Sequence, residues 1–125
     1  MLKVERCFAE TLQAFAQAAF GKHGQEALEA MGQTYVAELL PDRSRLQSQL
    51  QAYAAACDDV EIRAAVAQGY GRLVAFVEQA TDLPPQEVAR FFATGMLLNV
   101  IAAVQDGAGT EWVARLLAGC GKESV

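Results

Sequence analysis

Residues 91–104 read FFATGMLLNVIAAV, and this stretch decides the fold. Its only polar side chains are Thr94 and Asn99, which point about 140° apart on a helix that turns about 100° per residue. They therefore form no polar face, and a helix that is apolar on all sides must be covered on all sides. A domain of this size covers one side of a late helix, so the pattern predicts a second copy of the chain against the other side. The alternative is a central helix enclosed within one subunit.

Apolar residues recur at three- and four-residue steps along the rest of the chain, which is the spacing of amphipathic helices. We therefore expect an all-α fold with six helices and no strands. The expected helices cover residues 2–20, 25–40, 42 or 44 to 57, 58–80, 84–104 and 110–119.

Breaks between these helices follow from residues that end or begin helices. Pro41 ends the second helix, because proline lacks the amide that a helix interior needs. Asp58, with Glu61 three residues later, forms a start resembling a capping box for the fourth helix. Residues 106–109 are expected to form a loop, and Thr110 is expected to cap the last helix.

The composition limits the classes of protein to which this chain can belong. The chain has 125 residues, which suits a single domain over residues 1–125, and its 53% hydrophobic content excludes a disordered chain. The net charge is −5, and the arginines are scattered singly among carboxylates. Because phosphate contacts need clustered lysines and arginines, we expect no DNA contact by this chain alone.

Cysteine usage and hydropathy predict a cytoplasmic location. Cys7, Cys57 and Cys120 have no CxxC spacing, which is typical of reduced thiols used as small apolar residues. No signal peptide is expected, and no apolar run approaches about 18 residues without a polar break. The sequence therefore predicts no membrane contact.

Catalytic and metal chemistry are not expected. The single histidine, His23, has Glu26 three residues later, but a dedicated metal site needs three or four ligands. The chain lacks a serine or cysteine nucleophile with a paired histidine and lacks a glycine-rich phosphate loop. We expect no enzymatic activity, no metal and no cofactor.

Four sequence blocks follow one another in a recognisable order: QLQAYAA at 49–55, EIR at 61–63, YGRLV at 70–74 and VARFFATGMLLNV at 88–100. With their order and spacing, the stretch Ala27–Val104 resembles the C-terminal regulatory domain of TetR-family transcriptional repressors.

The resemblance implies a six-helix orthogonal bundle in which successive segments of the chain have different roles. Residues 1–20 would be the connecting helix, and residues 25–80 would surround a small hydrophobic effector. Residues 84–119 would pair with a second copy as a four-helix interface of a homodimer. Since the chain starts at the connecting helix, DNA would be bound only through an N-terminal helix-turn-helix domain that this chain lacks. The alternative function is a free-standing helical protein-interaction module with no small ligand.

Within such a bundle, the predicted ligand contacts are the residues that face inward on the helical pattern. They are Met31, Tyr35, Leu46, Gln49, Tyr53, Tyr70, Val74 and Met96. The tyrosines could instead be core or boundary residues with their hydroxyls in water, and Gln49 could be a boundary residue. The acidic composition and apolar interior favour a neutral or cationic apolar ligand.

The predicted dimer interface lies on the last two helices. It comprises Phe91, Gly95, Leu98, Asn99, Ala102, Trp112 and Leu116. Asn99 has three candidate roles: fixing the register of the dimer as a buried amide can in coiled coils, bonding a ligand, or bonding a backbone carbonyl.

Two glycines interrupt the fourth helix, Gly69 and Gly71. Each costs about 1 kcal/mol relative to alanine in a helix. They indicate either close packing of helices or a bend that opens the pocket.

Overall fold

The computed structural model of the chain describes residues 2–105 and 111–123. Within these residues the protein is all-helical, with six α-helices and no strand, as predicted. The elements are α1 (Lys3–Ala19), α2 (Gly24–Thr34), the π-helical turn η1 (Tyr35–Leu39), α3 (Arg43–Ala55), α4 (Val60–Thr81), α5 (Pro85–Val104) and α6 (Glu111–Glu123).

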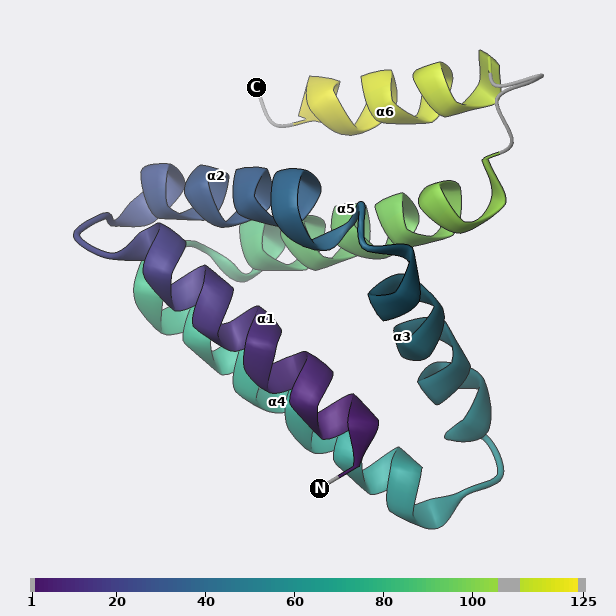
Figure 1. The fold of residues 1–125 in the computed structure, drawn as a ribbon. Coiled ribbons are helices and arrows are strands. Elements are labelled where there is room, and N and C mark those ends of the chain that lie inside the picture. Colours follow the sequence, from purple (N-terminus) through teal and green to yellow (C-terminus); the bar gives the residue numbers. More distant parts are fainter. Residues whose placement is uncertain (1, 106–110, 124–125) are drawn as a thin grey trace.

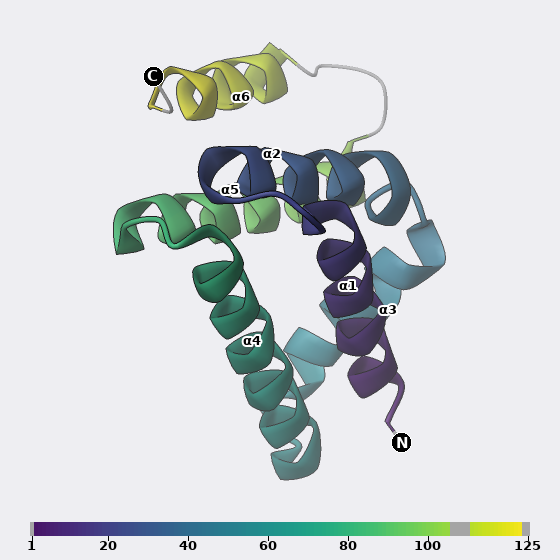
Figure 2. The ribbon, with the colours of Figure 1, turned by 90° about the vertical axis from the view of Figure 1, so that its left-hand side faces the viewer.

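The helices cross in two sets. α1 packs against α2 and α4, and α5 packs against α2, α3 and α4. The α1 and α4 helices run steeply across α2 and α5 (Figure 1). The last helix, α6, lies beyond α2 and α5 on the side away from α4 (Figure 2). Helices α1 to α5 thus meet around one interior, and α6 lies at its edge.

The hydrophobic core lies where α1, α2, α4 and α5 meet. Its buried members are Phe15, Ala19, Ala27, Leu28, Met31, Leu73, Val77 and Val88. They recur at three- and four-residue steps, which places the members from each helix on one face. Burial of these faces supplies the main driving force for the fold.

The cap of α4 corrects one prediction. Asp59, not Asp58, caps this helix: its side chain accepts hydrogen bonds from the amides of Glu61 at 2.9 Å and Ile62 at 3.1 Å. Asp58 is one residue too early, because its own amide still bonds to the carbonyl of Ala55 at 3.1 Å. It therefore belongs to the closing turn of α3.

The second predicted helix, 25–40, is not uniform. After α2 it widens into η1, where the amide of Leu40 bonds to the carbonyl of Tyr35, five residues back, at 2.8 Å. Such wide turns are rare in proteins, and those that occur often lie at functional sites. Tyr35 is the first residue of this turn, and its side chain points into the interior described below.

The predicted loop at 106–109 and the predicted cap at Thr110 lie outside the described residues. α6 begins at Glu111 and continues to Glu123, past the predicted end at residue 119.

One side of α5 is uncovered. Ala89, Ala93, Val100 and Val104 are exposed, and at about 100° per residue they fall on one face, named here the α5 stripe. Val100 and Val104 are 48% and 59% exposed. The described residues therefore cover only part of this apolar helix.

Among the described residues, α5 is also the one helix long and apolar enough to cross a membrane, by length and composition alone. The sequence predicts no such segment, since Thr94 and Asn99 interrupt the apolar run. A single helix of this kind is weak support for a membrane span, because core helices of other proteins meet the same criteria.

Candidate functional site

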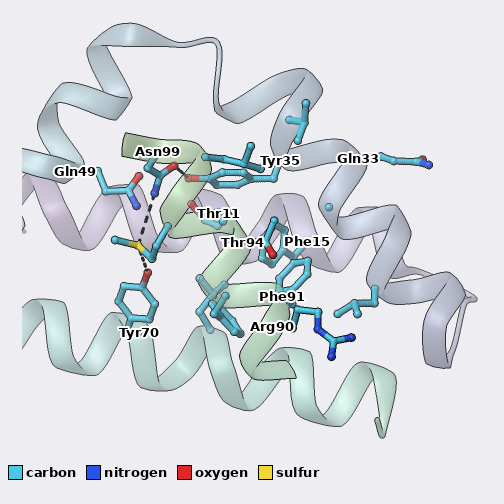
Figure 3. A pocket seen from close by; sticks show the side chains of 18 of the residues that line it. Thr11, Phe15, Gln33, Tyr35, Gln49, Tyr70, Arg90, Phe91, Thr94 and Asn99 are labelled. Atoms are coloured by element: carbon cyan, nitrogen blue, oxygen red, sulfur yellow. Dashed lines mark hydrogen bonds between the residues drawn. The ribbon is translucent and has the colours of Figure 1, made fainter. Parts of the chain in front are cut away.

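A cavity of about 750 Å³ opens in the interior between the helices. Residues of α1, α2, η1, α3, α4 and α5 line it, and α6 contributes Leu117. Figure 3 shows Gln49, Tyr70 and Asn99 at one end, and Phe91, Arg90 and Gln33 toward the other. The end around Asn99 is named here the polar end.

Aromatic rings form much of the wall. Phe15 and Phe91 meet edge to face with their ring centroids 5.8 Å apart, and Phe91 meets Phe92 in the same way at 5.3 Å. Phe8 meets Tyr70 at 5.4 Å. Edge-to-face contacts hold such rings in fixed positions, so the wall is apolar and pre-formed.

At the polar end, hydrogen bonds join η1, α4 and α5. The Tyr35 hydroxyl donates to Asn99 Oδ1, and the Tyr70 hydroxyl donates to Met96 Sδ at 2.9 Å. Asn99 Nδ2 lies 3.8 Å from the same sulfur, a weak acceptor. Asn99 is only 2% exposed, and these bonds satisfy part of its amide.

Helix α3 contributes a second polar row. Arg45, Gln49 and Tyr53 are spaced four residues apart, so they share one face, and all three line the cavity. Gln49 Nε2 donates to the Tyr53 hydroxyl at 2.7 Å. Arg45 Nη2 donates to the Cys7 carbonyl at 3.2 Å and to the Thr11 hydroxyl, both on α1.

Burial holds Tyr35 and Tyr53 in their neutral form. Burial raises the pKa of the Tyr35 hydroxyl, and the Asn99 hydrogen bond and the Arg45 charge oppose it only in part. Burial also raises the pKa of Tyr53 well above its ordinary value. At neutral pH both are therefore uncharged hydroxyls that can donate or accept hydrogen bonds.

The structure brings together five of the eight predicted ligand residues: Tyr35, Gln49, Tyr53, Tyr70 and Met96 all line the cavity. The other three lie elsewhere. Met31 is fully buried in the core, Leu46 is buried, and Val74 is half-buried; none of them lines the cavity. On α4 it is Leu73, one residue earlier and so about 100° around the helix, that reaches the cavity.

The predicted interface residues are divided between two places. Phe91, Gly95, Leu98 and Asn99 line the cavity, and Ala102 is half-buried, with its carbonyl accepting from Arg43 at 2.9 Å. On α6, Trp112 is half-buried and Leu116 is 42% exposed.

On α5 the predicted interface and the uncovered face are therefore different faces. Gly95 and Leu98 lie nearly opposite Ala93 and Val100 at about 100° per residue. Asn99 is also bonded within its own chain, to Tyr35, rather than presented on the α5 stripe. A second copy that meets the α5 stripe would therefore contact residues of α5 other than the predicted ones.

Several cavity residues were not predicted, notably Thr11 and Arg45 and the ring of Phe15. The four-residue spacing that joins Arg45 to Gln49 and Tyr53 could have identified Arg45. Thr11 gives no such signal, because its hydroxyl meets Arg45 only when the fold brings α3 beside α1.

No known protein family, curated protein or solved structure matches this chain, and its function is therefore inferred from the cavity and the arrangement of the helices.

Proposed function

We propose that this chain is the effector-binding and homodimerisation domain of a TetR-like transcriptional repressor of the cytoplasm. A small, mainly apolar molecule would occupy the cavity, and DNA would be bound by an N-terminal domain outside this chain. The cavity carries the proposal: its volume of about 750 Å³ lies within the range of small-molecule sites. Such sites combine an apolar wall with a few polar groups that orient the ligand. We propose no enzymatic activity.

The position of α1 gives the proposal a mechanism. Cys7, Phe8, Thr11 and Phe15 are all on α1, and all line the cavity. A ligand that fills the cavity would touch the helix that the resemblance makes the connector to the DNA-binding domain. Regulation requires that the ligand bind one position of this helix better than another, because only a difference in affinity shifts an equilibrium.

Dimerisation is supported by the apolar surface that the chain leaves uncovered. The α5 stripe is exposed, and on α6 Leu116 and Leu117 are 42% and 39% exposed. Exposed apolar patches mark interaction sites, and pairing of identical faces about a two-fold axis would cover them. The same surface could serve a helical interaction module without a ligand, which the experiment below distinguishes.

Thermal unfolding in the presence of a library of small apolar compounds tests the ligand site. A compound at a hundred times its Kd stabilises the folded protein by about 2.7 kcal/mol. The matched variants are Gly95→Phe and Gly71→Phe, because a Cβ at either position meets no atom within 4 Å, yet only Gly95 lines the cavity.

We expect compounds that stabilise the wild type to stabilise Gly71→Phe equally and Gly95→Phe much less, since the new ring occupies the cavity. A library without any stabilising compound would favour the interaction module. Equal stabilisation of both variants would place the ligand outside the cavity.

A further inference from the structure

Arg45 brings an uncompensated positive charge to the cavity. Its Nη2 donates to the Cys7 carbonyl and the Thr11 hydroxyl, which are both neutral acceptors. The Thr11 hydroxyl itself donates to the Cys7 carbonyl at 3.0 Å, so its oxygen is free to accept from the guanidinium. Arg45 Nε is buried and has no hydrogen-bond partner among the described residues.

No carboxylate of the described residues neutralises this charge. The one ion pair found there joins Arg90 to Glu87, both on α5, at 3.2 Å. A cation removed from water without a partner of opposite charge is costly, because apolar surroundings stabilise charge poorly. A guanidinium also offers several N–H donors in a planar fork, which matches the two oxygens of a carboxylate.

Neutral hydrogen-bonding groups surround Arg45 at the same end. Gln49 is one helical turn along α3, and Tyr35 is close enough for the Arg45 charge to oppose the rise of the Tyr35 pKa. Tyr35 stays protonated because burial dominates that pKa. The polar end therefore offers one cation and several neutral hydrogen-bonding groups, and beyond it the rings of Phe15 and Phe91 provide apolar wall.

We propose that the cavity binds an amphipathic anion, an apolar molecule that carries one carboxylate, with the carboxylate paired to Arg45 and the apolar part against Phe15 and Phe91. This rests on the proposed ligand-binding function and specifies its ligand class. It replaces the neutral or cationic ligand that the acidic composition favours. The net charge of −5 belongs to the whole sequence and does not give the charge at the polar end.

Three ligands with the same ten-carbon chain test the proposal on the wild-type protein: decanoate, 1-decanol and decylamine. Binding is measured as displacement of N-phenyl-1-naphthylamine, an uncharged fluorescent dye, with each ligand kept below the concentration at which it forms micelles. We expect decanoate to bind at least about tenfold more tightly than decanol, as a charge-assisted hydrogen bond allows, and decylamine to bind most weakly.

The variant Arg45→Gln removes the charge, and Arg72→Gln is its control, because Arg72 is exposed on α4 and lies outside the cavity. We expect Arg45→Gln to lose at least about tenfold of decanoate affinity while decanol affinity stays within about threefold. Arg72→Gln should leave both unchanged. If Arg45 only ties α3 to α1, its replacement would weaken all three ligands alike, and that result would overturn the proposal.

The three ligands on the wild-type protein test the preference for a carboxylate even if Arg45→Gln does not fold. Binding of the dye and decanol with no preference for decanoate would overturn the carboxylate inference alone. Failure of the dye and all three ligands to bind would overturn the ligand-binding function together with it.

Discussion

Alanine substitution is expected to have opposite effects at the two glycines of α4. Replacing glycine by alanine in a helix interior stabilises by about 1 kcal/mol. Gly71 is exposed and a Cβ there meets no atom within 4 Å, so Gly71→Ala should gain this amount in full. At Gly69 the new Cβ would fall on the ring of Phe8, on atoms near the start of that side chain.

Displacing the Phe8 ring would cost free energy of folding. It packs against Tyr70 at 5.4 Å and lines the cavity, so a displaced ring disturbs both. Overpacking of this kind costs about 1–3 kcal/mol, which offsets or exceeds the helix gain. Gly69→Ala should therefore be about 1–3 kcal/mol less stable than Gly71→Ala and should also bind ligands of the cavity more weakly.

Urea unfolding followed by circular dichroism measures this difference, with both variants at one protein concentration because self-association shifts apparent stability. Equal stabilisation by the two substitutions would refute the close approach of α1 and α4 at Gly69. It would restore the alternative that both glycines serve a bend.

Two further predictions concern the interface and the buried tyrosines. Ala93→Glu, on the α5 stripe, should shift a dimer toward monomer in sedimentation equilibrium. The control Ala75→Glu, at an exposed position of α4, should leave the dimer unchanged. A dimer unaffected by Ala93→Glu would exclude the stripe as the interface. Burial raises the pKa of Tyr35 and Tyr53 in the folded protein, so the unfolded chain loses these protons first, near pH 10. The contribution of these two tyrosines to the free energy of unfolding should therefore be constant below that pH and fall above it. Tyr53→Phe should make the fall shallower in urea unfolding at pH 9 to 11, and an unchanged slope would contradict the burial of that hydroxyl.

The number and type of helices could be predicted because their apolar residues recur with helical spacing, and burial of one face decides such elements. The cap of α4 could not be placed to the residue. Asp58 and Asp59 are equally good caps in sequence, and only the hydrogen bond from the Asp58 amide to Ala55, which ends α3, distinguishes them.

The tyrosines and Gln49 could be assigned to the cavity because each lies beside the apolar face of its helix. Arg45 shares their four-residue spacing on α3, but its charge favours an assignment to the surface, and the prediction left it out; the fold places it beside α1. The face of α5 could not be predicted for a different reason. A helix that is apolar all round has no preferred side in its sequence, so Gly95 and Ala93 were equally plausible at an interface.

The wide turn η1 has a consequence for how this sequence can change. Tyr35 is the first residue of this turn and Arg45 lies beyond it on α3, yet both line the same cavity. Since each residue advances a helix by about 100°, adding or removing one residue between them would swing one of the two away from it. Val36, Ala37 and Glu38 are exposed, and Val36 and Ala37 also line the cavity. Glu38, which does not line the cavity, can therefore vary in the kind of residue, whereas the length of the segment must stay the same.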